Sequence, residues 1–242
     1  MKNYVVVTGS SGHFGRHLVE QLSKTYNIIA LSHNNSRQNP DQKLFPLIAD
    51  LGNLQGRSHA FEQINAILSA KKSALLGIVN NAYWTSLSDE MTARGDCYEG
   101  VYRAHLDFTL CLLPLLSQNS SVVAISSMYA HIAPKASNYP NGFLVNPLEY
   151  GAMKAAFESS TRWLSSMYSQ RLGIRFNNVA FGPFPSPSNS SHEFVQKLAE
   201  NTHLGRIGRP EEVVGPIKFL LSNDSSYVTG TTIHVDGGWS SW

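Results

Sequence analysis

The sequence predicts an α/β fold: a doubly wound parallel sheet of about seven strands with helices on both faces, in a three-layer sandwich. Three observations predict it. Short runs rich in Val, Ile and Leu recur along the chain, segments with helical spacing separate them, and a glycine-rich turn follows the first run. Strands of a parallel sheet are buried on both faces, so they appear as continuous apolar runs joined by crossover helices.

The predicted elements alternate regularly. The β-branched run Tyr4-Val-Val-Val7 predicts a buried strand, and residues 16–22 have the apolar spacing of a helix. Further apolar runs predict strands at 27–31, 44–49, 75–79, 121–125, 174–180 and 231–235, and the segments between them predict helices near 57–72, 98–116, 150–170 and 210–222. We expect one domain over 1–242, because doubly wound sheets often reach this length as one unit.

Composition narrows the classes of partner. The net charge is +2, from 19 basic and 17 acidic residues, without the clustered basic stripe of a nucleic-acid-binding protein. No apolar run approaches the roughly 20 residues that span a bilayer, and the first residues lack the pattern of a signal peptide. We expect a cytoplasmic protein that binds neither nucleic acid nor membrane. Cys97 and Cys111 lack metal-site spacing, so reduced thiols and no metal are expected.

The string Thr8-Gly-Ser-Ser-Gly-His-Phe-Gly15 lies between the first strand and the first helix. Glycines at such a turn let the backbone approach a pyrophosphate, and free amides at the helix start favour an anion. The string is therefore predicted to be the phosphate loop of a Rossmann-type dinucleotide site. Its expected cofactor-binding residues are Gly9, Ser11, Gly12, His13, Phe14 and Gly15.

The choice between dinucleotides depends on the end of the second strand. Enzymes that use NAD place a carboxylate there to bind the adenine ribose. This chain has Ser32 and His33 instead, with Arg37 nearby to pair with a 2′-phosphate, so NADP(H) is favoured over NAD(H). Asp50 and Leu51 follow the third strand and are expected to contact the adenine. Asp50 is also placed to cap the exit of that strand, and the two roles are compatible.

Tyr150 and Lys154 are four residues apart in a predicted helix, so their side chains emerge on one face. A phenol with a pKa near ~10 exchanges protons poorly at neutral pH, and an adjacent ammonium group lowers that pKa. Tyr150 is then a candidate general acid or base. Such a pair is also common on solvated helix faces. Its position after a strand that ends in Ser126-Ser127 favours the catalytic interpretation.

These strings, with Asn80-Asn81-Ala82 after the fourth strand, resemble the short-chain dehydrogenase/reductase family from Val5 to Trp239. The resemblance implies hydride transfer at C4 of a nicotinamide cofactor. It implies that Tyr150 is the catalytic acid/base, that Lys154 holds the nicotinamide ribose and that Ser127 positions a carbonyl or alcohol substrate. It further implies cofactor contacts from Asn81, Ala82, Gly182, Phe184 and Ser186.

The chain departs from the family pattern at three places. Its glycine spacing is T-G-x-x-G-x-x-G, Tyr83 stands where Asn-Asn-Ala is usually followed by Gly, and His105 stands where an Asn usually completes the proton relay. An imidazole can bind a relay water or shuttle a proton. The alternative is that His105 is a helix histidine satisfied by a backbone carbonyl.

The segment from Ser127 to Tyr150 is longer than is usual in the family. With the other departures, this insertion resembles oxidoreductases of bacterial nonulosonic acid pathways, such as those for legionaminic acid in flagellin glycosylation. That resemblance implies an amino-sugar or sugar-phosphate substrate, contacted by Lys135 and by tyrosines of an inserted substrate loop at about 128–148. The insertion could instead only pack over the cofactor cleft.

A second segment of interest is rich in Pro and Ser. Residues 183–191 follow a strand end, where open α/β sheets bind their ligands, and indicate either a passive surface loop or the start of a lid over about 183–203.

Two other functions remain as alternatives. Nucleotide-sugar epimerases and dehydratases share the glycine spacing and the Tyr-x-x-x-Lys pair, but the residues after the sixth strand leave no room for their separate substrate domain. A non-catalytic NADP-binding regulator is disfavoured because Ser127, Tyr150 and Lys154 are all present.

The terminal aromatic residues Trp239 and Trp242 indicate an interface or a chain end folded onto its own subunit. By analogy with relatives, we expect a homo-oligomer formed through the helices near 98–116 and 150–170, with a tetramer ahead of a dimer.

Overall fold

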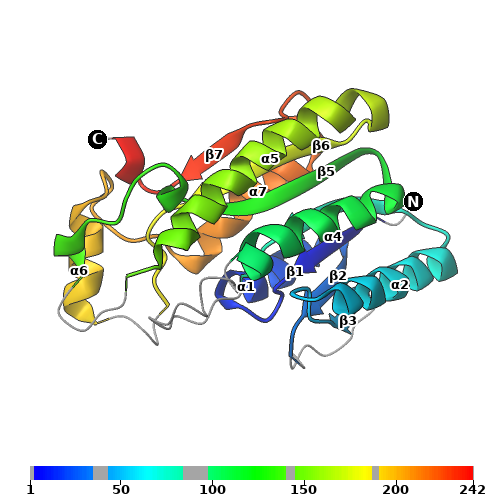
Figure 1. The fold of residues 1–242 in the computed structure, drawn as a ribbon, viewed down its shortest axis with the longest axis horizontal. Coiled ribbons are helices and arrows are strands. Elements are labelled where there is room, and N and C mark those ends of the chain that lie inside the picture. The colour runs from blue at the N-terminus through cyan, green and yellow to red at the C-terminus, as the bar shows by residue number, and fades with distance from the viewer. Residues whose placement is uncertain (1–2, 35–42, 84–97, 140–144, 187–190, 242) are drawn as a thin grey trace.

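Seven parallel strands form one sheet in the order β3-β2-β1-β4-β5-β6-β7 (Figure 1). This computed structural model describes residues 3–34, 43–83, 98–139, 145–186 and 191–241. The predicted fold class is confirmed. The strands are β1 (Tyr4–Thr8), β2 (Asn27–Ser32), β3 (Leu44–Ile48), β4 (Leu75–Asn80), β5 (Leu116–Ser127), β6 (Arg175–Phe181) and β7 (Thr232–Val235).

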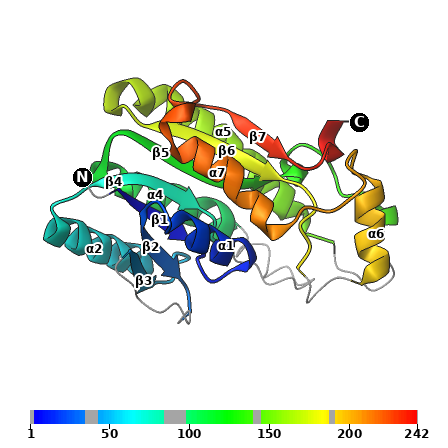
Figure 2. The same ribbon diagram turned by 180° about the vertical axis from the view of Figure 1, so that it is seen from behind.

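Helices cover both faces of the sheet. Helices α2 (Leu54–Lys71), α4 (Ala104–Leu112) and α5 (Leu148–Leu172) lie on the face seen in Figure 1. Helices α1 (His13–Leu22) and α7 (Val214–Leu221) lie on the opposite face, seen in Figure 2. The short helix α6 (His192–Glu200) lies apart from the sheet, at the end of the molecule that also carries the described C-terminal residues.

Alternating side chains of each strand supply two cores. In β1, Tyr4 and Val6 pack with α2, α4 and α5, whereas Val5 and Val7 pack with α1 and α7. All four side chains are fully buried. Burial of an aliphatic or aromatic side chain contributes about 1.5–3 kcal/mol, so the continuous apolar runs are what hold the central strands between the two helical layers.

The structure refines several predicted boundaries. The helix expected over 98–116 is divided into a π-helical turn at Tyr98–Arg103, α4, and a 3-10 turn at Leu113–Leu115 that contains Pro114. Pro lacks the N–H that a longer α-helix would need at that position. Helix α5 ends where Gly173 adopts φ +68, a left-handed conformation that glycine accommodates readily.

Helix α6 was expected only as part of a lid. Ser191 caps it by accepting a hydrogen bond from the Phe194 amide at 3.2 Å. Leu198 of α6 packs with Met128 and Trp239 in a small third core. Trp239 is therefore folded onto its own chain, whereas Trp242 lies outside the described residues.

The strand order determines where a ligand can bind. The sheet runs outward in both directions from β1 and β4, so the loops that follow these two strands diverge and leave a crevice at their carboxyl ends. The glycine turn follows β1, Asn81 and Ala82 follow β4, Ser127 ends β5, and Gly182 follows β6. In the described part of the chain, no helix is both long and apolar enough to span a bilayer.

Candidate active site

A cavity of about 700 Å³ opens at the carboxyl ends of the strands. It joins the glycine turn at one end to the Tyr150–Lys154 pair at the other. The residues predicted from the sequence that line it are Gly9, Ser11, Gly12, His13, Phe14, His33, Asp50, Leu51, Asn81, Ala82, His105, Ser127, Tyr150, Lys154, Gly182 and Phe184.

Four predicted residues are not identified in the lining of this cavity. Gly15, Ser32 and Ser186 are not among the residues that line the cavity, and Arg37 lies outside the described residues. The prediction also missed residues that the fold brings to the cavity wall, because they are apolar or lie beside a motif and carry no sequence signal of their own. They are Leu31, Asn34, Ala49, Gly52, Tyr83, Ala104, Ile125, Ser126 and Phe181.

The glycine turn needs its glycines for different reasons. Gly9 has φ +64, and a Cβ there would lie 2.6 Å from Ala82 Cα. A Cβ on Gly15 would lie 2.0 Å from the Gly9 carbonyl oxygen, so Gly15 lets the helix pack against the turn. Gly12 caps the N-terminus of α1 and lines the cavity. The turn therefore presents the N-terminus of α1 to the cavity, an arrangement that favours an anionic group.

Thr8 and Asn81 fasten the turn to the end of β4. The Thr8 hydroxyl oxygen accepts hydrogen bonds from the amides of Asn81 at 3.0 Å and Ala82 at 2.9 Å. In return, Asn81 Nδ2 donates to the carbonyl oxygens of Thr8 at 2.9 Å and Gly9 at 3.0 Å. Asn81 thus fixes the position of the glycine turn as well as lining the cavity.

Polar side chains near the ends of β2 and β3 form hydrogen bonds within the protein. Buried Ser32 donates its hydroxyl hydrogen to the Asn34 carbonyl oxygen at 2.6 Å. Asp50 accepts hydrogen bonds from the Gly52 amide at 2.9 Å and from Asn53 Nδ2 at 2.8 Å, so it caps the exit of β3. Asp50 also lies 4.0 Å from His33 Nε2 and lines the cavity.

The opposite end of the cavity contains the Tyr150–Lys154 pair of α5. Lys154 is only 5% exposed, so the pair does not form a solvated helix face. Its Nζ donates to the Ile125 carbonyl oxygen at 2.6 Å and lies 5.7 Å from the ring centroids of both Tyr83 and Tyr150. The two tyrosine rings pack edge to face, 5.1 Å apart. The protein thus holds a buried positive charge beside the Tyr150 phenol.

Ser127 ends β5 and is buried at the cavity wall. Its Oγ accepts a hydrogen bond from the Tyr129 amide at 3.2 Å, which starts the 3-10 turn Met128–Ala130. This contact leaves the Ser127 hydroxyl hydrogen available to donate, because a hydroxyl group can accept and donate at the same time.

His105 lies on α4 and is 2% exposed. Burial and the nearby Lys154 charge lower the pKa of His105 to about 3, although a hydrogen bond to the Ala82 backbone acts in the opposite direction. Its Nε2 atom has no hydrogen-bond partner among the described residues. His105 is therefore a neutral imidazole that contacts the Ala82 backbone and lines the cavity, and its buried Nε2 has no partner among the described residues.

The low pKa of His105 predicts a loss of stability in acid. Its value near 6.5 in the unfolded chain exceeds the folded value of about 3, so the unfolded state binds the proton first and stability falls as pH decreases from 6.5 toward 3. Between about pH 7.5 and about pH 5, this linkage costs roughly 2 kcal/mol. Urea unfolding at both pH values should show that the free energy of unfolding falls less in His105→Asn than in the wild type. An identical loss in both proteins would contradict the buried, neutral state of His105.

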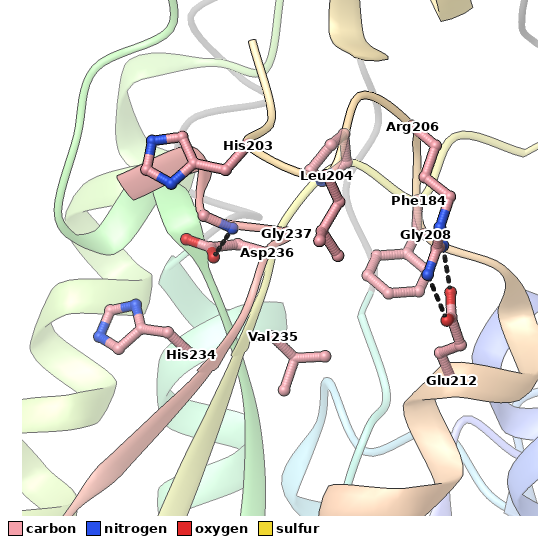
Figure 3. Close-up of a pocket in the computed structure, with 12 residues that line it drawn as sticks. Phe184, His203, Leu204, Arg206, Gly208, Glu212, His234, Val235, Asp236 and Gly237 are labelled. Atoms are coloured by element: carbon pink, nitrogen blue, oxygen red, sulfur yellow. Dashed lines mark hydrogen bonds and ion pairs between the residues drawn. The ribbon is translucent and has the colours of Figure 1, made fainter. Parts of the chain in front are cut away.

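Phe184 lines both the main cavity and a second one of about 410 Å³, whose residues Figure 3 shows. Its ring packs edge to face against Phe14 and Phe181, with centroids 5.4 Å away in each case. A Cβ on Gly208 would lie 2.3 Å from the Phe184 ring, so the ring is held closely on its other side. Phe184 is thereby fixed as part of the wall of the main cavity.

The described residues contain no group of three His, Cys, Asp or Glu side chains suited to a metal ion. Cys111 is an exposed free thiol on α4, away from the residues that line the main cavity, and Cys97 lies outside the described residues.

Residues 103–240 match the family model described as enoyl-(acyl carrier protein) reductase. The chain belongs to the short-chain dehydrogenase/reductase family. Its fold and site elements appear in the order expected from the sequence: a glycine turn after β1, Asn81 after β4, Ser127 at the end of β5 and the Tyr150–Lys154 pair on α5.

Three comparisons give the range of similarity. An uncharacterized short-chain type dehydrogenase/reductase of Sinorhizobium fredii is 29% identical over 252 aligned residues, which cover 98% of this chain and 43% of the relative. The chain thus spans less than half the length of that relative. The post-translational flagellin modification protein A of Campylobacter coli is 26% identical, with 97% of both chains covered. A short-chain dehydrogenase of Leptospira borgpetersenii with bound NAD⁺ has the same fold, at 24% identity, a TM-score of 0.86 and coverage of 99% of this chain and 93% of that chain.

Proposed function

We propose that this chain is an NAD(P)-dependent oxidoreductase that transfers a hydride between C4 of the nicotinamide and a carbonyl or secondary alcohol. One observation carries the proposal: a single cavity joins the glycine turn at the N-terminus of α1 to Ser127, Tyr150 and Lys154. The first group of residues is suited to a dinucleotide phosphate, and the second to proton transfer at an oxygen atom.

The residues present fit a dinucleotide. Gly9 has no side chain, so the turn presents its backbone to the cavity. The cavity extends from this turn past Asn81 to Tyr150 and Lys154. The turn residues Gly9 to Phe14 would hold the pyrophosphate, and Asp50 and Leu51 the adenine. Asn81, Ala82 and Lys154 would hold the nicotinamide ribose, and Gly182, Phe184 and Ser186 the carboxamide.

The reduced nicotinamide, when bound, supplies the hydride. Ser127 donates a hydrogen bond to the substrate carbonyl oxygen, and Tyr150 transfers its phenolic proton to that oxygen as the carbonyl carbon is reduced to an alcohol carbon. The Lys154 charge stabilises the phenolate that remains. Neutral His105 lines the same cavity and is the proposed member of the proton relay in place of the Asn that is usual in the family. Alcohol oxidation runs through the reverse steps.

The cofactor preference is proposed to be NADP(H) over NAD(H). The last residue of β2 is Ser32 rather than a carboxylate, and His33 lies beside it at the cavity. A strand end without a carboxylate does not repel the 2′-phosphate of NADP(H). Arg37 follows in the sequence as a cation that would pair with this phosphate.

Replacing Arg37 by Ala should therefore weaken NADPH binding about tenfold, or roughly 1.4 kcal/mol, and leave NADH binding nearly unchanged. Fluorescence titration with both reduced cofactors measures this difference. The variant Arg171→Ala is the control, since Arg171 lies over the Tyr168 ring in the last turn of α5 and does not line the cavity. Equal losses for NADPH and NADH in Arg37→Ala would contradict pairing with the 2′-phosphate.

An amino sugar or sugar phosphate is the proposed substrate class. Two observations support this substrate class: the segment between Ser127 and Tyr150 is longer than is usual in the family, and the chain is similar to a flagellin modification protein. Lys135 and the tyrosines Tyr129 and Tyr139 are candidate contacts, and residues 128–148 are the proposed substrate loop. Residues 183–203 are the proposed lid, of which 192–200 form α6.

We also propose a cytoplasmic homo-oligomer of single-domain subunits, with a tetramer ahead of a dimer. Helix α5 supports this assembly because Leu148, Trp163 and Met167 are 86%, 56% and 51% exposed. Large apolar side chains on one helix surface are suited to an interface.

Oxidation of reduced nicotinamide tests the reaction. Purified protein with NADPH is mixed with a panel of keto sugars and simple ketones, and loss of the reduced cofactor is followed. Cofactor oxidation that depends on a carbonyl compound supports the oxidoreductase. Cofactor binding without turnover across the panel would instead favour the non-catalytic NADP-binding protein. Interconversion of a nucleotide sugar without net cofactor oxidation would favour an epimerase or dehydratase.

A further inference from the structure

Glu158 is a buried carboxylate that the proposed mechanism does not use. It lies on α5, one helical turn after Lys154 and two turns after Tyr150, and it is 3% exposed. A buried carboxylate is costly unless hydrogen-bonding partners compensate for the loss of water. Glu158 has two: the Ser126 hydroxyl group donates to Oε1 at 2.5 Å, and His131 Nε2 lies 2.9 Å from Oε2.

The inner end of this network lies at the catalytic centre. Ser126 lines the same cavity as Tyr150 and Lys154. Its neighbour Ile125 provides the carbonyl oxygen that holds the Lys154 ammonium group at 2.6 Å. Ser126 is thus the residue that links Glu158 to the lining of the cavity.

The outer end of the network reaches solvent. The His131 side chain is 35% exposed, and its ring lies 4.5 Å from that of His234, an exposed residue of β7. Figure 3 shows His234 beside Asp236 at the second cavity. Ser240 connects these two residues, because its hydroxyl group lies 3.4 Å from His234 Nδ1 and donates to Asp236 at 2.5 Å.

Carbonyl reduction at this site consumes one proton in each turnover. Tyr150 gives its proton to the product oxygen, so the phenolate must recover a proton from solvent before the next turnover. The polar groups in line from the surface are His131, Glu158 and Ser126, and each is of a type that can accept and release a proton.

We propose that His131 and Glu158 form a proton path from solvent to Ser126, which restores the proton of Tyr150 after each reduction. This proposal rests on the proposed function. His131 passes its Nε2 proton to the Glu158 carboxylate and takes a new one from solvent. The resulting carboxylic acid protonates the Ser126 oxygen as Ser126 releases its own proton, through water in the cavity, to the Tyr150 phenolate. Alcohol oxidation uses the path in reverse.

The surrounding charges suit this role. Lys154 lies one turn before Glu158 on α5, and His234 with Asp236 lies beside His131 from the β7 side. The network thus has the Lys154 side chain one turn from Glu158 at its inner end and the Asp236 carboxylate close to His234 at its outer end.

Glu158→Gln tests the path with little change in shape. Its amide oxygen can still accept the Ser126 hydrogen bond, but the side chain cannot carry a proton. In rapid mixing with NADPH and an accepted carbonyl compound, we expect one equivalent of NADPH per site to be oxidised at the wild-type rate. Later turnovers should be at least about tenfold slower. Cofactor affinity should stay within about twofold of the wild type.

A second variant, His131→Ala, tests the outer end and does not alter the buried carboxylate. We expect the same slow later turnovers, restored by imidazole added to the buffer, because the partly exposed side chain leaves an opening that imidazole can reach. His59→Ala on α2 is the matched control, since His59 is exposed, contacts the Gln63 side chain and does not line the cavity. In His59→Ala, later turnovers should be as fast as in the wild type, and added imidazole should not change their rate.

Three results would overturn the proton path. The first is wild-type speed in all turnovers of both variants. The second is a first turnover slowed as much as later ones, which would indicate that Glu158 only positions Ser126. The third is a His131→Ala defect that imidazole does not relieve. Absence of NADPH oxidation by the wild type would refute the proposed function itself, and the proton path with it.

Discussion

Tyr150→Phe is expected to lower kcat by about 10²–10⁴-fold while leaving the Kd for NADPH within about twofold of the wild type. The substitution removes only the phenolic oxygen, which is the proton donor of the proposed reaction. The ring remains to pack edge to face with Tyr83, whose centroid lies 5.1 Å away, and beside the Lys154 ammonium. Steady-state kinetics and fluorescence titration on the same preparation measure the two quantities.

The matched control is Tyr168→Phe, the same chemical change on the same helix. Tyr168 packs against Trp163 and Phe176 and does not line the cavity. Its kcat should equal that of the wild type. Retention of activity by Tyr150→Phe would remove Tyr150 from the reaction and favour a different acid.

Gly15→Ala is expected to weaken NADPH binding at least about tenfold and to lower the free energy of unfolding by roughly 1–3 kcal/mol. The new Cβ would lie 2.0 Å from the Gly9 carbonyl oxygen and 2.9 Å from the Ser10 carbonyl carbon, so the backbone of the turn must move. Because the same turn presents the N-terminus of α1 to the cavity, its displacement affects the proposed pyrophosphate site directly.

Gly215→Ala provides the control for this substitution. Gly215 lies in α7, and a Cβ there would meet no atom within 4 Å. Ala is the better helix former, so a gain of up to about 1 kcal/mol is expected, without effect on the cofactor. Urea unfolding and NADPH titration compare the two variants. Wild-type NADPH affinity in Gly15→Ala would show that the phosphates bind elsewhere.

The sheet could be predicted from the sequence because its strands are buried on both faces. In a run such as Tyr4-Val-Val-Val7, consecutive large apolar side chains point to opposite faces of the sheet, so both faces must be covered to bury them all. Helix α6 could not be predicted as firmly, since it follows a Pro- and Ser-rich segment and packs outside the main cores. The apolar spacing of Phe194, Val195 and Leu198 after Ser191 was the signal available for it.

The site was predictable only in part. Motifs located the glycine turn, Ser127, Tyr150 and Lys154 at one end of the sheet, but residue types alone did not distinguish a solvated helix face from a buried pair. Burial of Lys154 makes that distinction. The cofactor contact of Gly15 stays a prediction, and what the fold adds is that Gly15 packs closely against Gly9 within the turn.

Contacts between distant segments carry no local sequence signal. Glu158 and His131 are 27 residues apart and meet only because β5, the turn after it and α5 pack together. The same holds for Phe184 and Gly208, which come from different loops. The residues of the proposed proton path therefore could not be selected from the sequence.

Titration of the purified protein with NADPH and NADH, followed by nicotinamide fluorescence, tests the central claim most directly. The cavity of about 700 Å³ between the glycine turn and the Tyr150–Lys154 pair is proposed to bind one nicotinamide dinucleotide. We predict saturable binding with one site per chain, tighter for NADPH than for NADH and weakened in Gly15→Ala but not in Gly215→Ala. Failure of the wild-type protein to bind either cofactor would contradict the account.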